Sequence, residues 1–276
     1  MQRVKGVLDV LREEGDVTRP PLLYKYRAFD QYTQRIFENN EVHFSSPRSF
    51  NDPFDSMLRF IYEGSTADRK RFLNAQSAQH RPDLPRRVHL DYAKRIRKQG
   101  WDLQDMAPGL KNQLMDLREQ MGVFCMTQDE ANIVMWSHYA SRHTGFCIGF
   151  RTDLSPFSRV RPVDYDAGGP ASINVLALWD RWDELTARAA RGLLTKAADW
   201  SYEHEWRIVD SPLSGGVGTR EYQPEALADV ILGCRVGTDD KRRIIEWCRA
   251  RNPRPILHQA KEKEREFGLD IVQIPY

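Results

Sequence analysis

WSYEHEWRIV, residues 200–209, predicts a β-strand that carries two carboxylates two residues apart. Side chains on a strand repeat every second residue, so Glu203 and Glu205 are expected to point to the same face. Because like charges placed side by side repel each other and partly buried carboxylates are costly, the pair indicates a functional site. The alternative is a surface edge strand with two solvated acids.

The composition is that of an ordinary globular protein of one large domain. The chain has 276 residues, with 41 Lys and Arg against 39 Asp and Glu, for a net charge of +2. This balance gives no overall argument for binding to nucleic acid or membranes. No apolar run approaches membrane-spanning length, and the four cysteines lack the CxxC spacing of zinc sites. Residues 1–14 are charged and do not resemble a signal peptide, so we expect a cytoplasmic protein without membrane partners.

The pattern of apolar residues predicts an α+β fold with a mostly antiparallel sheet. Residues 62–122 are strongly charged, helical in pattern and interrupted by prolines, unlike the β-rich sequence on either side. We therefore expect a single domain over residues 1–276, with a helical insertion or lid at 62–122. The expected strands are 22–29, 42–46, 123–128, 144–150, 160–165, 200–209, 230–233 and 270–274, and the expected helices are 3–15, 31–39, 132–139, 173–199 and 238–251.

The strand at 22–29 carries a cationic face. Alternation places Lys25 and Arg27 on one side and Tyr24 and Tyr26 on the other. Arginine binds carboxylates and phosphates with two parallel hydrogen bonds, whereas lysine acts as a point charge. The alternative is an edge strand with solvated cations.

Two further polar segments interrupt apolar sequence. Residues 45–55, SSPRSFNDPFD, contain hydroxyls, carboxylates and an amide close to Phe44 and Phe54. This composition is typical of a binding loop or of a rigid turn held by side-chain hydrogen bonds. Residues 135–140, MWSHYA, contain His138 five residues before His143. That spacing does not place two imidazoles on one helix face, so a zinc site is not expected. The sequence also lacks the glycine-rich loops that bind phosphates in P-loop and dinucleotide-binding folds.

Several of these segments, taken in order, resemble a bacterial family called domain of unknown function 2971. They are LLYKYRAFD, VHFSSPRSFNDPFD, FCMTQDEANIVMWSHYASRHTGFCIGF, WSYEHEWRIV and DVILG, which extend from Leu22 to about Gly233. This resemblance names a family and implies almost no biochemistry. A family of this kind, spread patchily among bacteria, suggests a toxin or an anti-phage defence effector.

The same segments are more distantly similar to the ADP-ribosyltransferase superfamily. Its members begin with an aromatic and cationic strand, continue to a serine motif and end with a catalytic glutamate on a strand, often as Glu-x-Glu. The resemblance implies that Arg27 holds NAD, that Ser45 or Ser46 is the motif serine, and that Glu205 is catalytic with Glu203 as the second acid. The serine follows the first helix unusually early, and the insertion at 62–122 separates it from the later motifs.

The resemblance implies a transfer of ADP-ribose from NAD to a protein or nucleic acid acceptor, or hydrolysis of NAD, with no metal. Glu205 would stabilise the oxocarbenium ion that forms when nicotinamide leaves, and Glu203 would position or deprotonate the acceptor. Arg27, or else Lys25, would bind the NAD phosphates, and Tyr139 or Tyr26 would stack on nicotinamide. The residues expected to bind NAD are Arg27, Lys25, Tyr26, Ser45, Ser46, Tyr139 and His138.

Two other functions stay open. A metal-dependent nuclease or other hydrolase would use carboxylate oxygens as Mg²⁺ ligands. Its candidate ligands are Asp52, Asp55, Glu203 and Glu205. A non-catalytic sensor or interaction module would use the polar clusters only to fix turns and strands, and the insertion would bind a partner.

Overall fold

The computed structural model describes residues 17–98, 108–165 and 168–276, and its centre is an eight-stranded sheet. The helix expected at 3–15 and part of the segment 62–122 lie outside the described residues. The sheet is antiparallel except for one parallel pair, β10 with β11, so the expectation of an α+β fold is confirmed. In spatial order the strands are β12 (Leu269–Gln273), β11 (Ile256–Glu262), β10 (Leu227–Leu232), β5 (Phe146–Arg151), β1 (Leu22–Arg27), β4 (Gly122–Thr127), β8 (Glu205–Asp210) and β6 (Arg161–Pro162).

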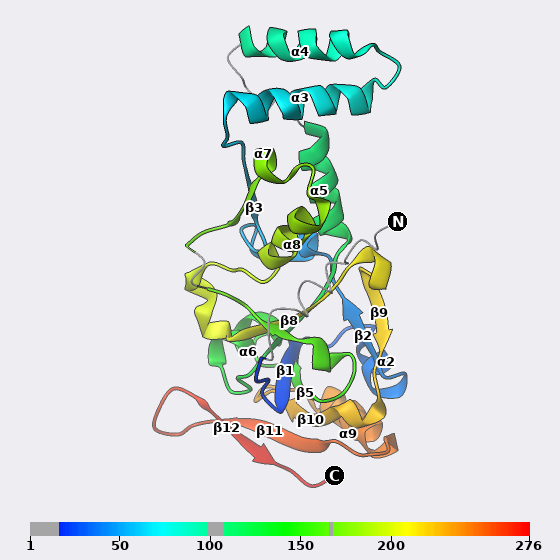
Figure 1. The fold of residues 1–276 in the computed structure, drawn as a ribbon. Coiled ribbons are helices and arrows are strands. Elements are labelled where there is room, and N and C mark those ends of the chain that lie inside the picture. Colours follow the sequence, from blue (N-terminus) through cyan, green and yellow to red (C-terminus); the bar gives the residue numbers. More distant parts are fainter. Residues whose placement is uncertain (1–16, 99–107, 166–167) are drawn as a thin grey trace.

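Alternation along the central strands gives the sheet two apolar faces. One face, with Leu23, Ile148 and Val230, packs against α2 (Thr33–Glu38), α9 (Thr238–Ala250) and the ribbon of β2 (Glu41–Phe44) and β9 (Gly218–Glu221). The other face, with Tyr26 and Cys147, packs against α6 (Ile133–Tyr139). Figure 1 shows the sheet near the bottom of the molecule, with α9 and the β11–β12 hairpin at its lower edge.

The sheet opens between β1 and β4. The two strands pair only at Tyr24 and Thr127, whereas β1 pairs with β5 along its whole length. At the other end of β4, Val123 exchanges two backbone hydrogen bonds of 2.8 and 2.9 Å with Ser45, which follows β2. Between these points the edge of β4 faces a gap, and the candidate site lies over it.

A second apolar core supports an elongated helical part. Here β3 (Leu58–Ile61) pairs in parallel with β7 (Ala171–Asn174), beside α5 (Pro108–Gln120), α7 (Val175–Leu178) and α8 (Trp182–Gly192). Beyond them α3 (Thr66–His80) and α4 (Arg86–Lys98) form a hairpin at the far end of the molecule (Figure 1). None of the helices in the described part of the chain combines the length and the apolar character needed to cross a membrane.

Several expected elements differ from the structure. The helix expected at 173–199 is instead the strand β7 followed by α7 and α8, because β3 provides a pairing partner that is distant in sequence. Residues 198–203 form a 3-10 helix, η3 (Ala198–Glu203), so the strand expected at 200–209 begins only at Glu205. The strand β11 was not expected, because much of its sequence is charged or polar. It forms a strand by pairing in parallel with the buried strand β10.

Gly145 tests the close packing at the C-terminal end of β1. A Cβ atom at this position would lie 2.1 Å from the Arg27 carbonyl oxygen, which is backbone and cannot move aside easily. We expect Gly145→Ala to lower the free energy of unfolding by about 1–3 kcal/mol. Gly237→Ala is the control, since its Cβ would meet no atom within 4 Å; because Gly237 is the N-cap of α9, we expect a loss of about 0.5 kcal/mol, smaller than at Gly145. Equal urea denaturation midpoints for the two variants would contradict this packing argument.

Candidate functional site

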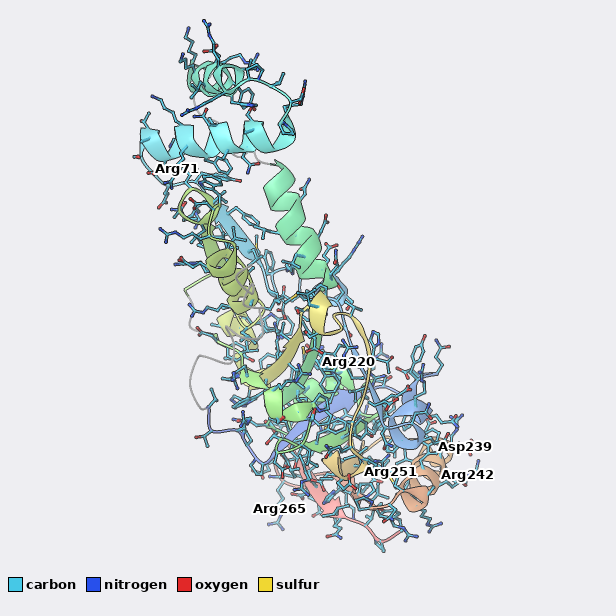
Figure 2. The ribbon with its side chains drawn as sticks, turned by 45° about the vertical axis from the view of Figure 1, so that its right-hand side comes forward. Arg71, Arg220, Asp239, Arg242, Arg251 and Arg265 are labelled. Atoms are coloured by element: carbon cyan, nitrogen blue, oxygen red, sulfur yellow. The ribbon has the colours of Figure 1, made fainter. Side chains whose placement is uncertain are left out.

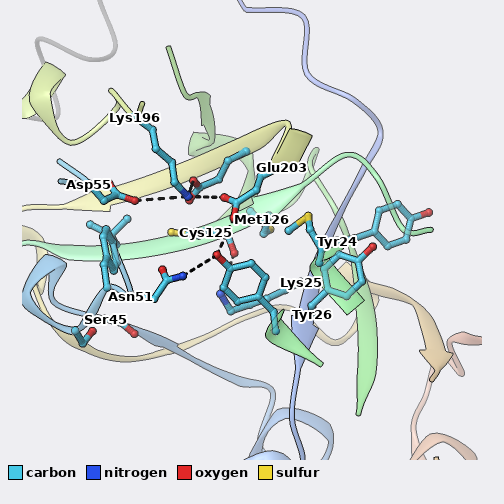
Figure 3. Close-up of a pocket in the computed structure, with 16 residues that line it drawn as sticks. Tyr24, Lys25, Tyr26, Ser45, Asn51, Asp55, Cys125, Met126, Lys196 and Glu203 are labelled. Atoms are coloured by element: carbon cyan, nitrogen blue, oxygen red, sulfur yellow. Dashed lines mark hydrogen bonds and ion pairs between the residues drawn. The ribbon is translucent and has the colours of Figure 1, made fainter. Parts of the chain in front are cut away.

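A cavity of about 270 Å³ lies over the gap between β1 and β4. Tyr24 and Tyr26 line it from β1, Tyr139 from α6, and Glu203 from the end of η3. Figure 3 shows Lys196 between Asp55 and Glu203, with the two tyrosines of β1 on the far side of Glu203. The cavity therefore joins aromatic rings from the sheet with a cluster of carboxylates beside it.

Glu203 and Glu205 meet, but not by alternation on one strand. Glu203 ends η3, and His204 then adopts a left-handed conformation with φ of +43°, which turns the chain into β8. Both carboxylates accept a hydrogen bond from the Lys196 ammonium, at 3.1 Å for Glu205 and at very short range for Glu203. The expectation that one strand face presents the two acids is wrong, because Glu203 belongs to the 3-10 helix and only Glu205 belongs to β8.

Glu205 is held by a buried guanidinium. Arg207, two residues further along β8, donates two hydrogen bonds of 2.8 Å to the two carboxylate oxygens. Its Nη1 and Nη2 donate to the two carboxylate oxygens of Asp55 at 2.8 and 2.7 Å, so Nη2 is shared between the two acids, and the contact ties β8 to the loop before β3. Arg207 is only 1% exposed and Glu205 only 5%. Burial alone would raise the pKa of Glu205, but Arg207 and Lys196 outweigh it and lower this pKa to about 2.

The cluster contains more acids than its two central cations can neutralise. Three carboxylates, Asp55, Glu203 and Glu205, share Lys196 and Arg207. Burial raises the pKa of Glu203, and the nearby Glu205 raises it further, although Lys196 and the Tyr139 hydroxyl oppose this. The pKa of Lys196 is raised despite its burial, because all three acids favour its charged form. Glu203 is therefore the carboxyl of the pair that takes up a proton more readily.

Tyr139 joins Glu203 to the open part of the cavity. Its hydroxyl donates to Glu203 Oε1 at 2.7 Å and accepts from Asn51 Nδ2 at 3.3 Å. Burial and the charge of Glu203 raise the pKa of this phenol, so it stays protonated as a donor. The arrangement fixes the phenol ring at the cavity wall and orients Glu203 by a second contact besides Lys196.

Lys25 lies in the gap of the sheet. Its ammonium donates to the carbonyl oxygen of Cys125 at 2.8 Å, which β4 would otherwise offer to a neighbouring strand, and it lies 4.4 Å from the centre of the Phe124 ring. Burial lowers the pKa of Lys25. No carboxylate of the described residues forms an ion pair with it, and its hydrogen bond goes to a neutral carbonyl. Lys25 also lines a second cavity of about 440 Å³, together with Arg27.

The structure brings together six of the residues expected from sequence. The lining of the first cavity includes Lys25, Tyr26, Ser45, Tyr139, Glu203 and Glu205. Tyr26 is fixed by a hydrogen bond from its hydroxyl to the Asp129 carbonyl at 2.8 Å, and its ring meets the edge of Trp136. Its freedom to stack on a ligand is correspondingly small.

Three expected residues lie away from this cavity. The Ser46 hydroxyl donates to the Glu119 carbonyl at 2.6 Å and caps the 3-10 helix after it, so it faces α5. His138 is exposed, because α6 buries Met135 and Trp136 on the opposite side. Arg27 lines the second cavity, where it pairs with Asp30 at 2.6 Å.

The carboxylates considered as metal ligands already have other partners. Asp52 accepts a hydrogen bond of 2.9 Å from the Phe54 backbone within its turn, and Asp55 binds Arg207. The Lys196 ammonium occupies the position between Asp55 and the two glutamates that a cation would need. Within residues 17–98, 108–165 and 168–276, no three His, Cys, Asp or Glu side chains are placed to hold a metal ion.

Lys196, Arg207 and Asn51 are the site residues absent from the set expected from sequence, although Arg207 lies within the strand at 200–209. Lys196 follows α8 in the apolar stretch GLLTKAADW, seven residues before Glu203, and is 8% exposed. A single lysine after buried leucines was the available signal, and it belongs to no motif. Asn51 was noticed only as part of the polar segment 45–55.

Comparison with known proteins gives one match. A family model described as "Protein of unknown function (DUF2971)" matches residues 135–160, which include most of α6 and all of β5. The matched segment contains Tyr139 and supports the resemblance to domain of unknown function 2971, whereas the similarity to the ADP-ribosyltransferase superfamily gains no support from it. No curated protein and no solved structure matches the chain.

Arg207→Met tests whether the buried guanidinium holds the site together. Removing its charge leaves Asp55 and Glu205 buried with one shared ammonium, so we expect the free energy of unfolding to fall by about 3–5 kcal/mol. Arg151→Met is the matched control, because Arg151 pairs with Asp153 on the surface, and we expect a loss of at most about 1 kcal/mol. Denaturant unfolding measures both, and comparable small losses would contradict a central role for Arg207.

The lowered pKa of Glu205 predicts that the free energy of unfolding depends on pH. The folded protein favours the ionised form of Glu205 over the protonated form. The resulting contribution of Glu205 to the free energy of unfolding is complete above the ordinary pKa of 4.5, and it is lost as the pH falls towards 2. The difference in unfolding free energy between the wild type and Glu205→Gln should therefore shrink by roughly 3 kcal/mol over that interval.

Denaturant titrations at several pH values measure this difference. Glu225→Gln serves as the control for the substitution itself, because Glu225 is exposed and its replacement should change the free energy of unfolding by less than about 0.5 kcal/mol. A wild-type advantage over Glu205→Gln that stays constant down to pH 2 would show that Glu205 is not held in its ionised form.

Proposed function

We propose that the cavity over the β1–β4 gap is the active site of an enzyme that cleaves the nicotinamide–ribose bond of NAD. ADP-ribose would pass to a macromolecule or to water. The observation that best supports this proposal is the position of Glu203. This carboxyl lines the cavity and belongs to a cluster of three acids and two cations. Loss of nicotinamide builds positive charge on the ribose, and an excess of negative charge next to it would lower the barrier.

Glu203, rather than Glu205, is the carboxylate that we assign to the reacting ribose. Both oxygens of Glu205 are occupied by Arg207, and one also binds Lys196, so its charge is already compensated. Glu203 has the raised pKa and contacts the cavity through Tyr139. In this assignment Glu205 and Arg207 position Lys196, and Lys196 in turn holds Glu203.

The remaining cavity residues suit the other parts of the substrate. Tyr24 and Tyr139 offer aromatic surface to the nicotinamide ring. Lys25 has no carboxylate partner among the described residues, so the phosphate oxygens of the NAD diphosphate would serve as its anionic partner. Arg27, which the superfamily resemblance assigns to NAD, already pairs with Asp30 and is the less suitable of the two cations.

Nicotinamide release from NAD tests the proposal. We expect release by the wild type and at least a hundredfold lower rate for Glu203→Gln, with a similar melting temperature, because the variant keeps the shape of the side chain but loses its charge. Glu225→Gln should keep the wild-type rate. The assay should be run with and without nucleic acid and cell extract, which supply acceptors.

The opposite results are equally clear. Full activity in Glu203→Gln would remove Glu203 from the chemistry. The absence of nicotinamide release in every condition, together with no NAD binding by calorimetry, would refute the assignment of NAD cleavage. It would favour the non-catalytic module, in which the buried pairing of Arg207 with Asp55 and Glu205 serves the fold alone.

A further inference from the structure

Positive charge is concentrated in the hairpin of α3 and α4, residues 66–98, which we call the arm. The arm contains ten Lys and Arg residues against three Asp and no Glu, a net charge of +7, whereas the whole chain carries +2. The rest of the protein is therefore net acidic. Seven of the ten cations are arginines, the side chain best suited to bidentate contact with phosphate.

The packing of the hairpin determines which face of α4 is free. His89 is buried, and its two ring nitrogens contact the Ser77 hydroxyl of α3 at 2.8 Å and the Leu84 carbonyl of the following turn at 3.1 Å. Arg87, Lys94 and Lys98 occupy positions i, i+7 and i+11, which share one side of a helix, and all three are exposed. They form a row with spacings of about 10 and 6 Å along the helix axis.

Few acids neutralise this row. Lys94 pairs with Asp91 at 3.1 Å, in an exposed contact that contributes little. Within the described residues, Arg87 and Lys98 have no ion-pair partner. Figure 1 shows α4 as the outermost element, with α3 between it and the rest of the protein, so a long partner can reach it without contacting the sheet.

We infer that the arm binds the phosphate backbone of a nucleic acid. A row of regularly spaced cations on a projecting helix matches a polyanion with a repeating charge, and its affinity would come from release of counterions. A membrane is the poorer partner, because the exposed large apolar side chains in the described part of α4 are only Val88 and Leu90. This inference does not depend on the NAD chemistry, although an arm-bound nucleic acid could serve as an acceptor.

Fluorescence anisotropy with a labelled DNA duplex of about two helical turns, and with single-stranded RNA of equal length, tests the inference. The arm variant is Arg87→Gln/Lys94→Gln/Lys98→Gln, full-length in each case. The control variant is Arg242→Gln/Lys261→Gln/Arg265→Gln, which makes the same change in charge at exposed positions. Arg242 and Arg265 lie near the other end of the molecule (Figure 2), and Lys261 lies in β11, also at that end (Figure 1). Circular dichroism and melting curves should be alike for both.

We expect the wild type to bind at least one of the two probes with a strong salt dependence. The arm variant should bind roughly tenfold or more weakly, and the slope of log K against log salt should decrease by about 1 for each cation removed. The control variant should stay within about twofold of the wild type.

Three outcomes would overturn the inference. The first is no salt-dependent binding by the wild type, and the second is equal loss in the two variants. The third is displacement of the probe by polyglutamate as effectively as by unlabelled nucleic acid at equal charge, which would identify an acidic protein surface as the partner. A loss confined to the arm variant, without displacement by polyglutamate, would support it.

Discussion

The buried pairing of Arg207 with Asp55 and Glu205 is the interaction on which the site depends. One guanidinium joins β8 to the loop before β3, and both carboxylates and the guanidinium are almost fully removed from water. Charges buried in this way are tolerated only when every one of them is paired. The pairing therefore fixes the end of β8, and with it the position from which Lys196 reaches Glu203.

The second constraint is the incomplete ladder between β1 and β4. A continuous sheet would satisfy the Cys125 carbonyl with a backbone donor, but here Lys25 donates to it instead. The gap leaves room for a cavity whose walls are two strands, α6 and the turn at Glu203. A cation without a carboxylate partner thus lies near a cluster with an excess of acids, a polarity that suits a substrate with separated negative and positive parts.

Much of the sheet could be predicted from sequence, because β1, β4, β5 and β10 carry alternating or continuous apolar residues within single short segments. The pair of strands β3 and β7 and the strand β11 could not, since their pairing joins distant or polar segments. The polar strand at 22–29 and the two glutamates, which the sequence singled out, both contribute to the lining of one cavity. The contacts of the two glutamates could not be predicted, because they depend on His204 turning the chain and on Lys196, which no motif identifies. His138 was misplaced because the face that α6 turns to the sheet is set by Met135 and Trp136.

A crystal structure of Glu203→Gln bound to NAD would test the central claim most directly. The account predicts that the nicotinamide riboside lies between Tyr24 and Tyr139, that the carbon bearing nicotinamide lies next to residue 203, and that Lys25 contacts the diphosphate. Glu205 should keep its two hydrogen bonds to Arg207. NAD bound with its ribose away from residue 203, or Glu205 released from Arg207 to contact the ribose, would contradict the assignment of the reacting carboxylate to Glu203.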